Sequence, residues 1–306
     1  MARVETTLKE IEMQVYTPDE KHAPSYLPKD KKWKLVWQDE FDGDSLDESK
    51  WNYRLNYWGV PSPTFTKEGV SVKDSNLTIA LVRKGDDFYS AHLQTGSLTF
   101  DIPTDKESTK GHPGFWPFGP KQEAKFMHRY GYYEIRCRLP KGAGWHAAFW
   151  LQAPGIGSHP NPEYSGVECD IMENYAQHSE KHSMVCGNGW GGYGAESKWA
   201  GHFSYPYEET DDGWHYYGVD WSEDGYTFYA DGKLVGSQLP PDCPVSKVEQ
   251  FILVSTECHG YNRYFAEIGG AGNPSDVCTP AEALFETYPD EFVVDFVRVY
   301  DAVNVK

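Results

Sequence analysis

The stretch GVECDIMENY, residues 166–175, sets three carboxylates, Glu168, Asp170 and Glu173, in an otherwise apolar run. Side chains on a β-strand alternate between the two faces of a sheet, so Glu168 and Asp170 should share a face that Glu173 does not. One extra residue, a β-bulge at Ile171-Met172, would return all three acids to one face. We predict this bulge, because bulges are frequent beside active sites.

Three acids on one face of a strand are suited to acid–base chemistry. Successive same-face groups lie within about 7 Å, and like charges at that distance raise the pKa of at least one carboxyl. Glycoside hydrolysis uses such a pair, one ionised and one protonated near neutral pH. A separation of about 5 to 5.5 Å predicts a nucleophile and a general acid/base, with retention at the anomeric carbon. The motif alone is also compatible with a solvated edge strand or a calcium-binding cluster.

The composition of the whole chain indicates one all-β domain. The chain has 306 residues, with 29 glycines, 20 prolines and 15% aromatic residues. Valine and threonine recur in short alternating runs, and long helical periodicity is nearly absent. The length suffices for one large β domain with a full core, so we expect a sandwich or barrel.

The charge of the chain favours a neutral partner. The formal net charge is −18 and the pI is near 5.0, which disfavours nucleic acid, anionic membranes and strongly sulfated polymers. No span approaches the roughly 20 apolar residues of a membrane helix. We therefore expect no nucleic-acid or membrane partner.

The first residues and the cysteines bear on the compartment. The start, MARVETTLKEIEMQ, is charged where a secretory leader would be apolar. The six cysteines include no CxxC pair, so we expect free, buried thiols, although Cys243 and Cys278 lie in loops and could pair. Both features favour the cytoplasm unless a leader has been trimmed.

The chain divides into a short N-terminal part and one continuous domain. Residues 1–31 end in the Pro-, Lys- and Asp-rich segment HAPSYLPKDKK and are predicted to be a surface extension. Residues 32–306 contain no linker and are predicted to form a single domain. Two long loops, 101–128 and 259–290, are expected to shape a binding site.

Several segments have the alternation and turn signals of strands. They are TIALVR (78–83), YGYYEIRCRL (130–139), HSMVCG (182–187), WHYYGVDW (214–221), FILVST (251–256) and FVVDFVRVY (292–300). In YGYYEIRCRL the odd-numbered residues Tyr133 to Leu139 are predicted to pack, and the even-numbered Glu134, Arg136 and Arg138 to face water. TFYADGKLV is predicted to be a hairpin, because Asp231-Gly232 suits a type I′ turn.

Five segments together resemble glycoside hydrolase family 16, the laminarinase, agarase and carrageenase group. ECDIMEN resembles its ExDxxE signature. The other matching segments, which cover about residues 33–300, are WKLVWQDEFDGDSLDESKW (33–51), YGYYEIRCRLPKGAGWHAAFWL (130–151), DGWHYYGVDWSEDGYTFYADGK (212–233) and VVDFVRVY (293–300). The strand has the longer, bulged form, which resembles the laminarinases and galactan-cleaving members more than the lichenase type.

The resemblance implies a concanavalin A-like β-jelly-roll, in which two curved antiparallel sheets leave a substrate cleft along a concave face. It implies that Glu168 is the nucleophile, Glu173 the acid/base and Asp170 an assisting residue, with no cofactor in catalysis. We expect a monomeric, retaining endo-β-glycan hydrolase whose partner is a polysaccharide or oligosaccharide, most simply a β-1,3-containing glucan. A β-galactan hydrolase, a non-catalytic glycan-binding jelly roll and a calcium-dependent adhesion module are the alternatives.

Aromatic side chains are expected in the cleft, because sugars present flat C–H faces to them. Trp145 and Trp150 are five residues apart and so on opposite faces of a regular strand, and we assign Trp145 to the cleft and Trp150 to the core. Trp190, in the glycine-rich CGNGWGGYG, is predicted to be a sugar platform, with a loop anchor as the alternative. Tyr164 and Trp199 are further candidates near the acids.

Other site residues rest on the resemblance. Asn56 and Trp58 correspond to residues on the non-reducing side of the cleft, and Glu123 and Lys125 to an acid and a base that touch sugar hydroxyls. His182 corresponds to a cleft residue after the acid/base strand, although it could equally be a structural histidine.

The family commonly holds a structural calcium on the convex side. The resemblance implies Asp295, Glu40 and the carbonyl of Gly43 as its ligands, and such an all-oxygen set suits calcium.

The chain departs from the family in two places. The usual Trp-Pro before Ala-Phe-Trp is Trp145-His146 here. FILVSTECHGY (251–261) lacks the Asn or Trp that many members present near the cleft centre, and Thr256 to His259 line that strand end instead. These departures bear on the substrate and leave the three acids in place.

Overall fold

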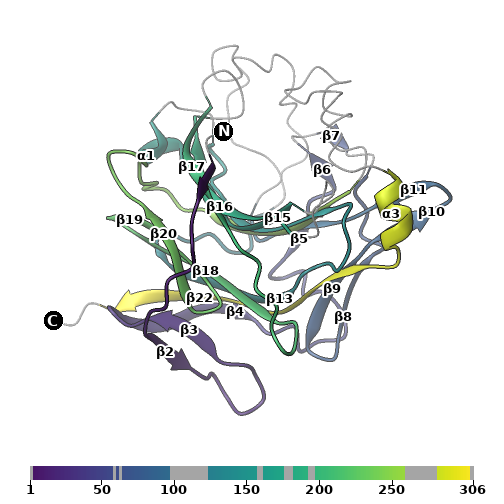
Figure 1. Cartoon of the computed structure of the whole chain (residues 1–306), viewed down its shortest axis with the longest axis horizontal. Coiled ribbons are helices and arrows are strands. Elements are labelled where there is room, and N and C mark those ends of the chain that lie inside the picture. Colours follow the sequence, from purple (N-terminus) through teal and green to yellow (C-terminus); the bar gives the residue numbers. More distant parts are fainter. Residues whose placement is uncertain are drawn as a thin grey trace.

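The computed structural model describes residues 3–57, 60–61, 64–96, 123–156, 161–175, 182–191, 197–258 and 281–303. Two large sheets pack face to face, as the layers in Figure 1 show. Neighbouring strands in both sheets are antiparallel except for β1, which runs parallel to β17. The predicted jelly-roll sandwich is confirmed.

The first sheet has the order β1 (Arg3–Glu5), β17 (Lys198–Tyr205), β16 (Met184–Trp190), β15 (Glu168–Tyr175), β14 (His146–Gln152), β21 (Phe251–Glu257), β12 (His92–Gln94) and β5 (Asn52–Tyr53). The second sheet has the order β20 (Lys233–Gln238), β19 (Gly225–Ala230), β18 (His215–Ser222), β13 (Gly131–Arg138), β22 (Glu291–Val303), β9 (Asn76–Ala80) and β8 (Val70–Lys73), and β4 (Lys32–Asp39) also pairs with β22.

Three small strand pairs and two short helices complete the described structure. The pairs are β2 (Met13–Tyr16) with β3 (Ser25–Pro28), β6 (Asn56–Tyr57) with β7 (Val60–Pro61), and β10 (Val82–Lys84) with β11 (Asp87–Tyr89). The helices are α1 (Pro162–Ser165) and α3 (Ala281–Thr287). Within the described ranges, neither helix is long and apolar enough to cross a lipid bilayer.

The core fills the space between the two sheets. Tyr133, Ile135, Cys137 and Leu139 of β13 and its following residue enter it, as their alternation predicts. The hairpin of β19 and β20 is also confirmed, and both turn residues, Asp231 and Gly232, have positive φ angles of 49° and 72°. Because only one face of each sheet is needed for this core, the opposite face of the first sheet is free to carry a site.

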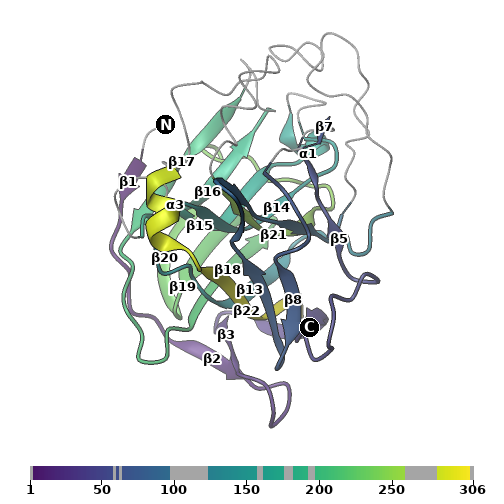
Figure 2. The ribbon, with the colours of Figure 1, turned by 90° about the vertical axis from the view of Figure 1, so that its right-hand side faces the viewer.

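The N-terminal segment is attached to both sheets. β1 extends the edge of the first sheet, which Figure 2 shows beside β17. The β2–β3 hairpin lies on the outer side of the second sheet, where Leu27 packs with Tyr132, Tyr229 and Tyr300. This hairpin corrects one prediction: Glu134, expected to face water, is buried beneath it.

The five cysteines that lie in the described ranges are free and buried. They include Cys243, so the structure does not support a disulfide from this residue. Cys278 lies outside the described residues.

Candidate active site

The bulge predicted in β15 is present. The register of β15 shifts against β16 between Asp170 and Glu173, and it shifts at the same place against β14. As a result Ile171 and Met172 both enter the core. Glu168, Asp170 and Glu173 therefore lie together on the opposite, outer face of the first sheet, as the predicted bulge requires.

The three acids differ in exposure and protonation. Glu168 is half-buried, whereas Asp170 and Glu173 are 4% and 7% exposed. Burial, reinforced by the charges of Glu173 and Glu168, raises the pKa of Asp170 well above its ordinary value. A protonated Asp170 can donate a hydrogen bond to a neighbouring carboxylate, which is the assisting role expected of it.

Tyr175 and His202 contact this cluster. The Tyr175 hydroxyl donates a hydrogen bond of 2.7 Å to Glu173 Oε1. His202 Nε2 lies 3.6 Å from Asp170 Oδ2, and burial lowers the pKa of this histidine, which favours its neutral form.

Two glycines of β16 make room for rings beside the acids. Gly187 lies opposite Asp170 and Gly189 opposite Glu168. A Cβ at Gly187 would lie 2.9 Å from His202 Cδ2, and one at Gly189 would lie 2.8 Å from the Trp199 ring. The ring of the half-buried Trp199, on the neighbouring strand β17, therefore lies over Gly189 on the acid face.

Trp190 does not have the predicted role of a sugar platform. It precedes the loop as the last residue of β16 and packs against the main core, so it is the anchor that was the alternative. Alternation explains the difference, because Gly189 faces the acid side and its neighbour Trp190 must face away.

The assignment of Trp145 and Trp150 is reversed in the structure. Trp145 is fully buried, and its Nε1 donates to Asp290 Oδ2 at 3.3 Å. Trp150 lies opposite Asp170 on the acid face, where its Nε1 donates to Ser255 Oγ at 3.0 Å. The strand begins only at His146, so the side chains that point to the acid face are His146, Ala148, Trp150 and Gln152.

His182 packs on an aromatic ring. Its ring stacks on Tyr207 with centroids 3.9 Å apart, and the Tyr207 hydroxyl lies 3.1 Å from Nε2 of His215 on the second sheet. This stacking is the role of a structural histidine, which was the alternative prediction for His182. The histidine that contacts the acid cluster is His202.

The remaining predicted cleft residues lie on other elements or outside the described residues. Tyr164 is 67% exposed on α1, four residues before β15 begins. Glu123 and Lys125 are exposed, and their backbones bond to Asn52 and Thr95 at the β5–β12 end of the first sheet. Asn56 belongs to β6, but its side chain and the whole of Trp58 lie outside the described residues.

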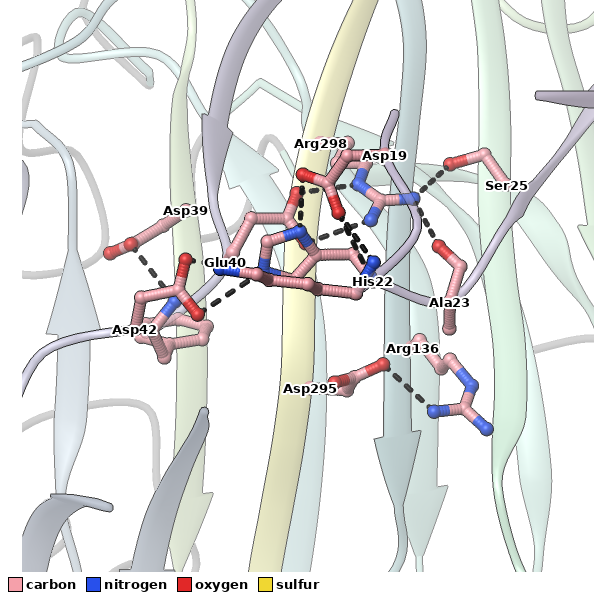
Figure 3. A network of polar contacts seen from close by, with 12 residues as sticks. Asp19, His22, Ala23, Ser25, Asp39, Glu40, Asp42, Arg136, Asp295 and Arg298 are labelled. Atoms are coloured by element: carbon pink, nitrogen blue, oxygen red, sulfur yellow. Dashed lines mark hydrogen bonds and ion pairs between the residues drawn. The ribbon is translucent and has the colours of Figure 1, made fainter. Parts of the chain in front are cut away.

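The residues expected to bind calcium do not fit a calcium site. Both oxygens of Glu40 accept from Arg298, at 2.7 Å each, and Asp295 accepts from Arg136 at 2.8 Å (Figure 3). Gly43 lines a hollow formed by residues 38–43, 45–48 and 50, and Asp295 is not among these residues. A cation would have to displace two guanidinium groups, so the set Asp295, Glu40 and Gly43 as arranged here does not suit calcium.

Another set of residues has ligand atoms close enough together to bind one metal ion. Single ligand atoms of Asp170, Glu173 and His202 lie within 4.8 Å of one another, the one such cluster among the described residues. A metal bound here would occupy the carboxylates that the acid–base reading needs free, and we assign none.

The sequence analysis assigned Trp150 to the core and gave no role at the acids to several other residues of the acid face. They are His146, Tyr175, His202 and Glu257. Strand alternation counted from His146 would have indicated Trp150, but the neighbours of β15 across the sheet depend on pairings between distant parts of the chain.

Comparisons with known proteins agree with this geometry. The sequence model of the family described as Glycosyl hydrolases family 16 matches residues 62–242. Glucan endo-1,3-beta-glucosidase A1 of Niallia circulans is 26% identical over 87% of this chain, which spans only 37% of that protein. Beta-porphyranase B of Phocaeicola plebeius is 25% identical over 95% of this chain and 92% of its own length.

The fold has solved counterparts. The catalytic domain of an endo-1,3-beta-glucanase (laminarinase) from Thermotoga petrophila RKU-1 superposes with a TM-score of 0.60 over 90% of this chain and 100% of that domain, at 23% identity.

Proposed function

The chain belongs to glycosyl hydrolases family 16, and from this premise we propose that it is a retaining, endo-acting β-glycan hydrolase that cleaves a neutral β-1,3-containing glucan. The observation that carries the proposal is the bulge in β15, which brings Glu168, Asp170 and Glu173 to one face. A bulge that serves only to bend an edge strand would not need three acids beside it, and β15 lies in the middle of its sheet.

The proposed reaction is a double displacement. Glu173 gives a proton to the glycosidic oxygen while Glu168 attacks the anomeric carbon, so the leaving sugar departs and a glycosyl-enzyme forms. The Glu173 carboxylate then takes a proton from water, and the resulting hydroxide displaces Glu168 with a second inversion. The product keeps the configuration of the substrate.

Asp170 and Trp150 support these steps in the proposal. A protonated Asp170 donates to the Glu168 carboxylate and holds it in place for attack. The buried Trp150 lies opposite Asp170 and limits water behind the acids.

Among the substrates of the family, we propose a neutral glucan for this chain. The relative from Niallia circulans is named for a β-1,3-glucan. A net charge of −18 opposes the approach of sulfated chains. A β-galactan is the second candidate, because a porphyranase matches almost the whole chain.

The test is hydrolysis of laminarin, mixed-linkage glucan, agarose and porphyran, with product masses and the anomeric proton signals followed by NMR. We expect oligosaccharides from laminarin with the β-anomer appearing first, and loss of this activity in Glu168→Gln by at least about 10³-fold. Light scattering should give the mass of one chain, since we propose a monomer.

The outcomes separate the alternatives. Products from agarose or porphyran alone would move the substrate to the galactans. Binding without cleavage by the wild-type chain would instead support the non-catalytic jelly roll, and binding abolished by a chelator would support the adhesion module.

A further inference from the structure

A second line of charged side chains runs away from Glu173 across the first sheet. His146 of β14 lies opposite Tyr175 of β15 on one side and opposite Glu257 of β21 on the other. His92 of β12 follows beyond Glu257. All three of these charged groups, His146, Glu257 and His92, are at most 6% exposed.

Short distances connect this line to the acid/base. His146 Nε2 lies 3.2 Å from Glu173 Oε1, and His146 Nδ1 lies 3.7 Å from Glu257 Oε2. The other oxygen of Glu257 lies 3.3 Å from His92 Nε2. The imidazole of His146 is also stacked on Tyr175, with ring centroids 4.5 Å apart and planes at 19°.

The two carboxylate oxygens of Glu173 have different surroundings. Oε1 accepts from Tyr175 at 2.7 Å and faces His146. Oε2 is buried and has no hydrogen-bond partner among the described residues. A buried carboxyl oxygen without a partner is costly, so it is expected to meet a group that comes from outside the described structure.

We propose that His146, held between Glu173 and Glu257, is a positioning residue that fixes Oε1 of Glu173 and leaves Oε2 as the atom that exchanges the proton with substrate and water. The role rests on the proposed hydrolase function. His146 does not touch substrate in this arrangement, and it acts through Glu173. Glu257 and His92 in turn fix the ring of His146.

The charges around His146 support this role. Burial alone lowers the pKa of His146, but the carboxylates of Glu173 and Glu257 outweigh it and raise the pKa to about 9. Burial alone raises the pKa of Glu257, but the neighbouring imidazoles of His146 and His92 outweigh burial and lower the pKa to about 2. Both shifts favour the charged forms of His146 and Glu257.

This pair helps both halves of a double displacement. A cation beside Oε1 stabilises the Glu173 carboxylate that remains after the proton has left, and that carboxylate is the base for water in the second step. Fixing one oxygen also orients the other, which avoids the cost of ordering the carboxyl at the transition state.

The test compares His146→Gln, Glu257→Gln and the double variant with wild type on the substrate that the panel identifies. We expect His146→Gln to lower kcat by roughly 10- to 100-fold with KM within about threefold, since Glu173 loses its orientation and the substrate keeps its contacts. Because the positive charge that faces the acid/base is removed, the alkaline limb of the kcat/KM profile should move up by roughly 0.5 to 1 pH unit. Because Glu257 acts through His146, the double variant should be no slower than His146→Gln.

His215→Gln is the matched control. His215 is equally buried and paired, with Nδ1 at 2.9 Å from Asp231, but it lies on the second sheet. This variant should lose stability without any change in the pH profile. If the kcat and pH profile of His146→Gln equal those of the wild type, or if the effects of His146 and Glu257 add fully, the proposal is overturned.

A measurement without catalysis keeps the two proposals separate. In ¹⁵N-labelled wild type, the His146 imidazole should titrate near pH 9, and both Glu257→Gln and Glu173→Gln should move that titration to lower pH. If no glycan is cleaved but this coupling is seen, the hydrolase function fails and the arrangement around His146 stands. If the titration is unaffected by Glu173→Gln, the positioning role fails whatever the activity, and this readout remains if His146→Gln does not fold.

Discussion

Trp145 and Trp150 lie five residues apart in one segment and have different surroundings. Trp145 is enclosed by Leu81, Phe88 and Leu284, whereas Trp150 lies opposite Asp170. We expect Trp150→Phe to lower kcat/KM by about 10-fold or more, because the ring and its bond to Ser255 support the acid cluster. Trp145→Phe should cost about 1–3 kcal/mol in the free energy of unfolding and leave kcat/KM within about threefold.

Denaturant unfolding and initial rates on the same preparations check both expectations. The pair is a mutual control, since each variant makes the same chemical change. The opposite pattern, with activity sensitive at Trp145 and insensitive at Trp150, would restore the sequence-based assignment.

At the scale of elements, the bulge in β15 is needed to keep Glu173 on the acid face. Deletion of Ile171 should restore regular alternation and turn Glu173 toward the core. The activity should then fall by about 10²- to 10⁴-fold. Ile171→Ala keeps the extra residue and removes only its buried side chain, and it should cost about 2–4 kcal/mol in stability while most of kcat is kept. An active deletion variant would show that the bulge is dispensable.

The bulge could be predicted from the sequence because the spacing of three acids conflicts with regular alternation inside one strand. The strands of the core and the Asp231-Gly232 turn could be predicted for the same local reason. The surroundings of Glu173 could not be predicted, since His146, Glu257 and His92 come from three other strands whose register is fixed by the whole sheet.

The β2–β3 hairpin buries Glu134 of β13, and this burial should make the stability of the protein depend on pH. Burial raises the pKa of Glu134 to about 8 from 4.5, although Ser25, the Tyr26 N–H and Arg298 favour its ionised form. The native state therefore binds this proton more tightly than the unfolded chain, and the contribution of Glu134 to stability should be fully present below pH 4.5 and be lost as pH rises toward 8. We expect the loss over this range to be on the order of 2–5 kcal/mol.

Glu134→Gln removes the titration and still offers an oxygen to Tyr26, so the variant should lose this slope and be the more stable protein at pH 9. Urea unfolding at pH 5, 7 and 9 measures it. Glu12→Gln, at an exposed pair with Lys29, is the control and should keep the slope of the wild type. A wild-type stability that does not fall between pH 5 and 8 would contradict the assignment.

At the scale of the whole molecule, Arg298 connects parts of the chain that are far apart in sequence. It lies on β22, is fully buried, and donates to Glu40 after β4 and to Ala23 and Ser25 of the N-terminal segment (Figure 3). The partners Arg298 and Glu40 are 258 positions apart. The sequence suggested a free carboxylate for calcium because such a partner cannot be identified without the fold.

The same contacts predict how the molecule responds to chelators. A buried guanidinium already supplies the positive charge at Glu40. The His22 ring lies between Asp19 and Asp42, at 2.8 and 3.1 Å, and although burial lowers its pKa, its bonds to these two carboxylates raise it overall. We expect EDTA or added calcium to change Tm by less than about 1 °C, whereas Arg298→Met should cost about 3–5 kcal/mol by leaving Glu40 buried without its partner. If EDTA lowers the Tm of the wild type but not that of Glu40→Gln, a cation binds at Glu40 after all, and the ion pair with Arg298 is not its native state.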